Sequence, residues 1–128
     1  MATKRLIVIG GVAAGTKAAS KAKREDPDLE VLILTREKDI SYAGCGLPYY
    51  IGGVIRERKE LVVKTPEDFA GELGIQVLTE CEVTKIDPLT KTVTYRDKTR
   101  EIVIPYDYLV LATGASPVLP KIRGWDLQ

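Results

Sequence analysis

The chain has 128 residues, of which 45% are hydrophobic and 29% are charged, with a formal net charge of +1. This length suits one domain, and the near-neutral charge gives no reason to expect nucleic acid or a membrane surface as a partner. Two cysteines are too few for a disulfide framework, and histidine is absent, so we expect a reducing, cytoplasmic setting and no metal site. The first apolar run, residues 6–9, is too short for a signal peptide or a membrane span.

The first third of the chain predicts a strand, a turn, a helix and a second strand. Residues 6–9 and 30–34 are short apolar runs, typical of buried parallel strands. Between them, residues 16–25 place alanines and basic side chains on different sides, which indicates a helix that ends at Asp26-Pro27-Asp28. This is a βαβ unit, and we expect its crossover to be right-handed.

The turn after the first strand carries the first chemical motif, Gly10-Gly11-Val12-Ala13-Ala14-Gly15. Gly10 and Gly15 fill the first and third places of the dinucleotide fingerprint Gly-x-Gly-x-x-Gly, and Val12 stands in the second. The small neighbours Gly11 and Ala14 leave room for a pyrophosphate at the helix N-terminus. The turn therefore predicts dinucleotide binding, with a glycine-rich turn of another α/β fold as the alternative.

The end of the second strand departs from that fingerprint. An acid is expected there for the ribose hydroxyls, but the residue is Thr35. Either the Thr35 hydroxyl makes a weaker bond, or Glu37, which follows Arg36, reaches round to the ribose. A solvated loop charge is the alternative for Glu37.

A cysteine stands among small residues in the stretch Ser41-Tyr42-Ala43-Gly44-Cys45-Gly46-Leu47-Pro48-Tyr49-Tyr50-Ile51-Gly52-Gly53. Pro48 favours a first helical turn, which puts Cys45 at or just before a helix N-terminus, where the dipole favours the thiolate. Gly44 and Gly46 leave the sulfur uncrowded, so a flat ring or a thiol substrate can approach. A structural cysteine beside a turn is the alternative.

The middle of the chain changes from helical to alternating patterns. Thr65-Pro66 begins a short helix that ends near Gly71 or Gly74, and residues 75–78 predict a brief strand. Residues 80–105 then alternate in three segments separated by turns, which predicts an antiparallel three-strand meander. Cys81, at the polar edge of its first strand, is interpreted as structural.

Residues 106–115 return to an apolar pattern that predicts a buried strand ending in a glycine turn. Ala112, Thr113 and Gly114 are small residues at the carboxyl end of that strand. In open α/β sheets, ligands bind in the crevice at this end of the strands. No further element is predicted beyond Ala115.

Together, the glycine turn, the cysteine stretch and residues 106–115 resemble the FAD-dependent pyridine nucleotide–disulfide oxidoreductases. More narrowly, they resemble the single-cysteine branch of coenzyme A disulfide reductases, NADH oxidases and NADH peroxidases. The resemblance implies an α/β, Rossmann-like FAD-binding domain with a parallel sheet and a β-meander. Residues 1–128 correspond to the N-terminal part of that domain, without the NADH-binding and dimerisation domains, and the full-length protein is expected to be a homodimer.

The resemblance also implies roles for individual residues. Cys45 matches the redox cysteine, and because Tyr50 stands where the dithiol branch has its second cysteine, we expect a mixed disulfide, a persulfide or a sulfenic acid on Cys45. Expected contacts to coenzyme A, with a solvated helix face as the alternative for the basic residues, come from Lys17, Lys21, Arg24 and Ser41. Expected contacts to FAD come from Gly10, Gly11, Ala14, Gly15, Arg36, Glu37, Val83, Ala112, Thr113 and Gly114, with Val83 meeting the adenine through its backbone.

The implied activity is NAD(P)H-dependent reduction of coenzyme A disulfide, or of another small thiol or persulfide. Oxidases and peroxidases of this branch carry a histidine where this chain has Ala13, which counts against oxygen or peroxide as substrate. Gly44 replaces an asparagine often found before the cysteine, which weakens one expected substrate contact. The alternatives are an NADH oxidase, a polysulfide or persulfide reductase, a non-catalytic apo fragment, and an NAD-binding Rossmann protein without a redox cysteine.

Overall fold

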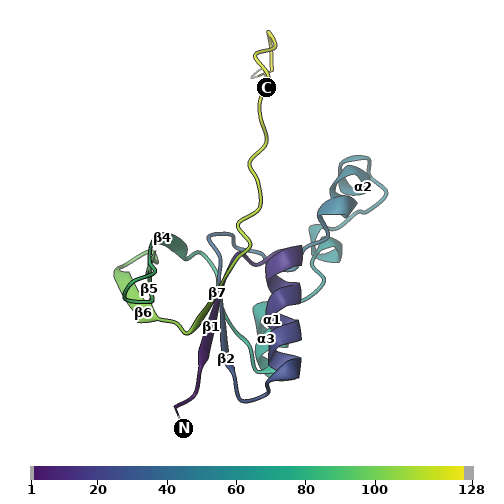
Figure 1. The fold of residues 1–128 in the computed structure, drawn as a ribbon. Helices are drawn as coiled ribbons and strands as arrows, with labels where there is room; N and C mark the ends of the chain where they lie inside the picture. Colours follow the sequence, from purple (N-terminus) through teal and green to yellow (C-terminus); the bar gives the residue numbers. More distant parts are fainter. Residues whose placement is uncertain (1, 126–128) are drawn as a thin grey trace.

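The structure, a computed structural model, describes residues 2–125. A parallel sheet stands at the centre, with two helices on one face and a small antiparallel sheet on the other (Figure 1). The described chain ends in an extended segment that leaves the sheet after Leu111. Residues 126–128, which the resemblance placed at the end of the matched region, lie outside the described residues.

The parallel sheet has the strand order β3-β2-β1-β7. Its strands are β1 Arg5–Ile9, β2 Glu30–Leu34, β3 Gln76–Leu78 and β7 Tyr108–Leu111. Helix α1, Ala13–Glu25, connects β1 to β2, so the predicted βαβ unit is confirmed. The helix begins earlier than predicted because the Val12 carbonyl already accepts the Thr16 N–H at 3.1 Å.

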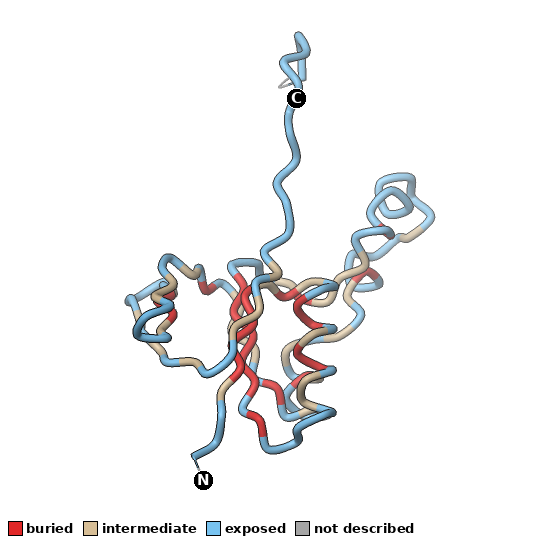
Figure 2. The backbone as a smooth tube through the Cα atoms, in the orientation of Figure 1, coloured by how far each residue is buried: buried red, intermediate tan, exposed pale blue. Residues whose placement is uncertain are grey.

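Each face of the sheet has its own core, which explains the uninterrupted apolar runs of β1 and β2. Alternate side chains of a strand point to opposite faces, so a strand covered on both sides is apolar at nearly every position. On one face, α1 and helix α3 (Pro66–Leu73) cover a core that includes Leu6, Val8, Ala19, Val31, Ile33, Phe69 and Ile75. On the other, the antiparallel sheet covers Ile7, Ile9, Leu32, Leu34, Cys81, Val93 and Tyr95, and Figure 2 shows the strands as the most buried part of the molecule.

The antiparallel sheet is the predicted meander. Its strands are β4 Glu82–Asp87, β5 Thr92–Arg96 and β6 Glu101–Pro105, in the order β4-β5-β6. Aspartates form both turns: Asp87 accepts the N–H groups of Leu89 and Thr90, and Asp97 accepts those of Thr99 and Arg100. Such side-chain bonds close the turns without using the strand backbone.

Two expectations for these strands need correction. Cys81 was expected in the polar edge of the first meander strand, but it precedes β4 and is buried, because its side chain belongs to the core between the two sheets. Residues 106–115 were expected to form a buried strand, but β7 spans Tyr108–Leu111 at the edge of the sheet. Among the described residues it pairs with β1 alone, so Tyr108 is 48% exposed and Leu111 is 64% exposed.

Residues 41–63 form a lobe that projects from the sheet, which we call the cysteine lobe (Figure 1). It contains the short turns η1 Gly44–Gly46 and η2 Arg58–Leu61 and the five-residue helix α2 Leu47–Ile51. The helix predicted from Pro48 is therefore confirmed, although it is short. Several apolar side chains of the lobe are exposed, including Tyr49, Ile51 and Val54. No helix in residues 2–125 is long and apolar enough to cross a membrane.

Candidate functional site

The glycine turn is closed by contacts that exclude side chains. Gly10 has φ +112°, and a Cβ there would lie 2.1 Å from the Ala112 carbonyl oxygen. A Cβ at Gly15 would lie 1.9 Å from the Gly10 carbonyl oxygen. Both positions therefore require glycine, because the backbone of the β7 end and the start of α1 pack directly on the turn.

The N-terminus of α1 opens at this turn without a competing group. Val12 is the N-cap residue, no described side chain caps the helix, and its first turn contains no acidic residue. The first backbone N–H groups of a helix have no partner within it, and the helix dipole makes this end partially positive. The arrangement suits an anionic group such as a pyrophosphate.

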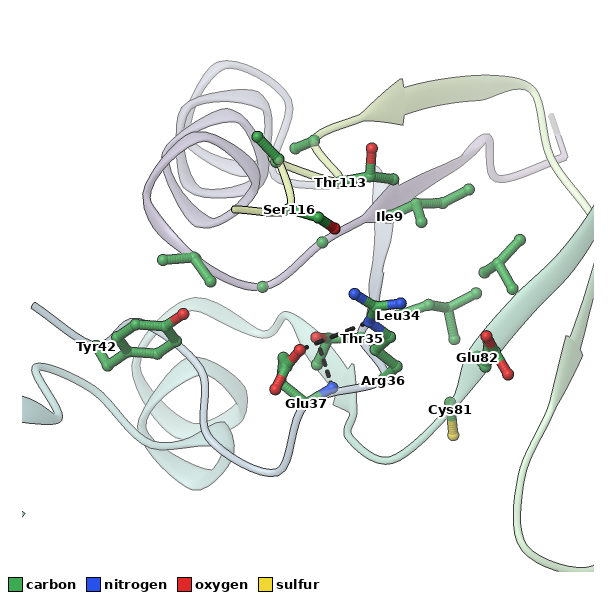
Figure 3. Close-up of a pocket in the computed structure, with 17 residues that line it drawn as sticks. Ile9, Leu34, Thr35, Arg36, Glu37, Tyr42, Cys81, Glu82, Thr113 and Ser116 are labelled. Carbon is green, nitrogen blue, oxygen red and sulfur yellow. Dashed lines mark hydrogen bonds and ion pairs between the residues drawn. The ribbon is translucent and has the colours of Figure 1, made fainter. Parts of the chain in front are cut away.

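A cavity of about 590 Å³ lies beside this turn (Figure 3). It is formed where β1, β2 and β7 end and β4 begins, which is the carboxyl edge of the parallel sheet. Its lining residues are Ile9, Gly10, Gly11, Val12, Leu34, Thr35, Arg36, Glu37, Tyr42, Cys81, Glu82, Val83, Ala112, Thr113, Gly114, Ala115 and Ser116.

The structure brings most of the predicted cofactor residues to this cavity, although their roles stay predictions. The lining includes Gly10, Gly11, Arg36, Glu37, Val83, Ala112, Thr113 and Gly114. Ala14 and Gly15 lie in the first turn of α1, next to the lining rather than in it. Residues from four separate parts of the chain thus meet at one edge of the sheet.

The segment after β2 is held in a tight turn at the cavity wall. Thr35 is buried, and its Oγ1 accepts the Glu37 N–H at 3.2 Å. The Thr35 backbone N–H donates to the Leu78 carbonyl at 3.1 Å, and its carbonyl accepts the Cys81 N–H at 2.9 Å. The Glu37 carbonyl accepts the Glu80 N–H at 3.1 Å. These bonds fix residues 35–37 against residues 78–81.

Sequence reasoning gave no binding role to several lining residues, among them Tyr42, Cys81, Glu82 and Ser116. Cys81 and Glu82 reach the cavity because the Cys81 N–H is bonded to the Thr35 carbonyl. No local sequence pattern predicts this long-range pairing. In Figure 3 the Cys81 sulfur points away from the other labelled side chains. Burial, with smaller contributions from Asp97 and Glu80, raises the pKa of the Cys81 thiol, so at neutral pH it stays protonated.

Cys45 lies elsewhere, in η1 on the cysteine lobe, where its side chain is exposed. Among the described residues that line the cavity, the lobe contributes Tyr42 but not Cys45. A Cβ at Gly46 would lie 2.7 Å from Leu61 Cδ2, so the turn that holds Cys45 packs tightly on η2. Both cysteines are free thiols, and one is exposed while the other is buried.

The predicted substrate residues lie outside the cavity. Lys17, Lys21 and Arg24 are exposed on α1, and Lys21 forms an ion pair with Glu25. Ser41 is half-buried with φ +49°, and its backbone joins the lobe to the glycine turn: its N–H donates to the Gly11 carbonyl at 2.7 Å, and its carbonyl accepts the Val63 N–H at 2.9 Å. Their contacts to a substrate stay predictions.

The family profile described as pyridine nucleotide-disulphide oxidoreductase matches residues 4–128. The chain is 42% identical over 125 residues to an NADH oxidase of Methanocaldococcus jannaschii, covering 97% of this chain and 28% of that protein. It is 40% identical over 114 residues to a coenzyme A disulfide reductase of Staphylococcus haemolyticus, covering 88% of this chain and 26% of that protein. The chain thus spans about a quarter of the length of these curated relatives.

One solved structure, an NAD-dependent persulfide reductase from A. fulgidus, superposes with a TM-score of 0.90 at 41% identity. The match covers 95% of this chain and 24% of that chain. The central sheet, the meander and the cysteine lobe are therefore parts of an architecture found in known oxidoreductases.

Proposed function

The chain belongs to the pyridine nucleotide-disulphide oxidoreductase family, and from this premise we propose that it forms the FAD-binding, cysteine-bearing part of an NAD(P)H-dependent oxidoreductase. The family uses FAD together with NAD(P)H. The observation that carries the proposal is the glycine turn, whose shape leaves no room for a Cβ at Gly10 or Gly15 and whose helix begins beside a 590 Å³ cavity.

The residues around the cavity fit a dinucleotide. The uncapped N-terminus of α1 supplies backbone N–H donors for a pyrophosphate, and the lining there is small, with Gly10 and Gly11. Val83 and Glu37 line the same cavity and are assigned here to the adenosine, while Thr113 and Gly114 line it just beyond the end of β7. Bound there, FAD supplies two-electron transfer from NAD(P)H.

Cys45 is the proposed nucleophile. Its thiolate attacks one sulfur of a disulfide R–S–S–R, so that a Cys45–S–S–R bond forms and one thiolate leaves as R–SH after protonation. Reduction of this mixed disulfide by two electrons, with two protons, releases the second R–SH and regenerates the Cys45 thiol. The exposure of Cys45 supports this assignment, because a disulfide must reach the sulfur directly.

The proposed substrate is coenzyme A disulfide or a related persulfide. A coenzyme A disulfide reductase and a persulfide reductase are among the similar proteins. The exposed basic residues Lys17, Lys21 and Arg24 on α1 support an anionic substrate, because coenzyme A carries phosphates. The chain contains no histidine that would serve as an acid or base near oxygen or peroxide.

A second candidate is an NADH oxidase, which reduces oxygen. The 42% identity to the M. jannaschii NADH oxidase supports it. The two candidates differ in what accepts the electrons, so NADH-dependent oxygen consumption and NADH-dependent thiol release separate them. We expect thiol release from coenzyme A disulfide to exceed oxygen consumption.

The deciding variant is Cys45→Ser in the complete protein, with Cys81→Ser as its matched control. We expect Cys45→Ser to lower disulfide reduction by a factor on the order of a thousand or more while FAD stays bound, because the nucleophile is lost. Cys81→Ser tests a thiol at the same cavity that the mechanism does not use. If Cys45→Ser still reduced disulfides at the wild-type rate, the assignment of Cys45 as the nucleophile would be wrong.

A further inference from the structure

A second, smaller cavity lies between the cysteine lobe and the segment that follows β2. Its volume is about 280 Å³. It is lined by residues of both parts: Glu37, Lys38, Asp39, Tyr42, Leu47, Arg58, Leu61 and Val62. Within residues 2–125, packed side chains do not fill this space, so the orientation of the lobe depends on the few bonds that connect it to the rest of the molecule.

The backbone holds the lobe at its base. Among the described residues, a single backbone hydrogen bond connects the lobe to the rest of the molecule, from the Ser41 N–H to the Gly11 carbonyl at 2.7 Å. The two ends of the lobe are joined to each other, since the Ser41 carbonyl accepts the Val63 N–H at 2.9 Å. Bonds gathered at one end of a segment fix where it begins but leave it free to tilt about that end.

One ion pair in the described chain crosses from the lobe to the segment after β2. It joins the Arg58 guanidinium to the Asp39 carboxylate. Asp39 is anchored by the next residue, Ile40, which is 1% exposed. Ile40 also packs on the glycine turn, because a Cβ on Gly11 would lie 2.9 Å from Ile40 Cγ2. The ion pair therefore connects the lobe to the part of the molecule that carries the glycine turn.

On the other side of the ion pair, Arg58 belongs to the turn that packs beside Cys45. This turn, η2, is closed by a capping box between its N-cap residue and its third residue. Leu61, at the end of η2, is 4% exposed, and a Cβ at Gly46 would lie 2.7 Å from its Cδ2. A displacement of η2 is therefore passed on directly to the residue next to Cys45.

We propose that Arg58 is a positioning residue for Cys45, because its ion pair with Asp39 holds the cysteine lobe in one orientation relative to the glycine turn. The proposal rests on the proposed role of Cys45 in disulfide reduction. The Arg58 side chain is 67% exposed and that of Asp39 is 29% exposed, so solvent weakens the pair. We therefore expect its loss to change the population of the working orientation by about threefold.

The first test measures the orientation of the lobe independently of the reaction. Spin labels are attached to Cys45 and to Lys85→Cys, an exposed position in β4, in the complete protein with its other cysteines replaced by serine. Pulsed electron spin resonance then gives the distribution of distances between the two labels. We expect Arg58→Met, which keeps an apolar stem but loses the charge, to broaden this distribution.

Three further variants separate the ion pair from other effects. Arg58→Lys keeps the charge, and the exchange of Asp39→Arg with Arg58→Asp restores the pair with its partners reversed, so both should give a narrow distribution again. The matched control is Lys59→Met, because Lys59 pairs with Glu57 at 2.6 Å inside the lobe. Its loss removes an ion pair from the same turn without affecting the contact with Asp39, and we expect the wild-type distribution.

The second test compares two rates in the complete protein. We expect Arg58→Met to lower NADH-dependent disulfide reduction about threefold, whereas Lys59→Met leaves it unchanged. The rate at which a small thiol reagent labels Cys45 should stay the same in both variants, because this thiol is exposed in every orientation of the lobe that we consider. A fall in disulfide reduction at constant labelling is the signature of positioning.

The outcomes separate this proposal from the one on which it rests. If Arg58→Met gives a distance distribution as narrow as wild type, or a broader one with unchanged disulfide reduction, the positioning role is overturned. If neither Arg58→Lys nor the charge exchange narrows the distribution, the pairing with Asp39 is overturned. If Cys45→Ser still reduces disulfides at the wild-type rate, the proposed function is overturned, and the label distances still decide whether Arg58 holds the lobe.

Discussion

The glycine-turn side of the molecule and the cysteine lobe are built by opposite means. Around the turn, main-chain atoms are packed so closely that side chains are excluded at Gly10 and Gly15, and the strands beneath are buried on both faces. The lobe is joined to the sheet through a few backbone bonds at Ser41, and much of its apolar surface is exposed. The cavity edge is thus held by close main-chain packing over two buried cores, whereas the exposed thiol of Cys45 lies on a segment held mainly at its base.

The widest predicted difference lies between the two thiols. We expect Cys45 to react with a disulfide reagent at neutral pH about a hundredfold or more faster than Cys81, because Cys45 is exposed and burial raises the pKa of Cys81. Peptide mass spectrometry after timed labelling gives the two rates separately. Equal rates would mean that the core between the two sheets opens freely.

The glycine turn is predicted to be the least tolerant site for a methyl group. We expect Gly10→Ala or Gly15→Ala to lower the free energy of unfolding by about 3 kcal/mol or more, because the new Cβ would overlap a backbone carbonyl. Gly71→Ala is the control: it lies in α3 with nothing within 4 Å of the added Cβ. We expect Gly71→Ala to raise the free energy of unfolding by about 0.5–1 kcal/mol, since alanine favours a helix more than glycine does. Urea unfolding measures all three.

The cysteine lobe should tolerate a similar change better. We expect Gly46→Ala to cost about 1 kcal/mol, because the added Cβ meets the flexible end of Leu61, 2.7 Å away, rather than backbone. Gly44→Ala, where the nearest atom is 3.9 Å away, is the matched neutral change. The rate at which a thiol reagent labels Cys45 is a more sensitive measurement than global stability. Gly46→Ala should change this labelling rate more than Gly44→Ala does. A global loss of stability as large as that of Gly10→Ala would remove the contrast between the two regions.

The smallest predicted effect lies in the meander turn and depends on pH. Hydrogen bonds from the Thr99 backbone, the Thr99 hydroxyl and the Arg100 backbone lower the pKa of Asp97 below its ordinary value of 3.8. A lowered pKa means that these bonds stabilise the fold above pH 3.8 and that this contribution is lost as the pH falls through the lower value in the folded protein. Asp97→Asn should therefore be less stable than wild type at pH 7, with the difference shrinking below pH 3.8. Unfolding curves across this range measure it, and a constant difference would contradict the assignment.

The fold was largely predictable from local pattern. Apolar runs at residues 6–9 and 30–34, the glycine turn between them and the alternation over residues 80–105 each match an element of the structure. Thr65 and Pro66 predicted the start of α3, where Thr65 accepts the Asp68 N–H in a capping box. These signals are short-range, so a single sequence carries them.

The site was predictable in part, because its remaining residues depend on long-range pairing. Thr35 bonds to Leu78 and Cys81, which places Cys81 and Glu82 at the cavity, and no periodicity reports that contact. The exposure of β7 also depends on its position in the sheet, which the apolar sequence of Tyr108–Leu111 does not reveal. The distance between Cys45 and the cavity likewise follows from the projection of the lobe.

The pairing of β7 with β1 sets an order of events during synthesis. Leu6 lies opposite Tyr108, so one edge of β1 has no strand partner until about a hundred later residues have been synthesised. At translation rates of roughly 5–20 residues per second, this interval is on the order of 5–20 s. The β2 pairing and both meander hairpins join nearby residues and can form within that time. Within residues 2–125, the carboxyl edge where Gly10 meets Ala112 is therefore among the last parts to close.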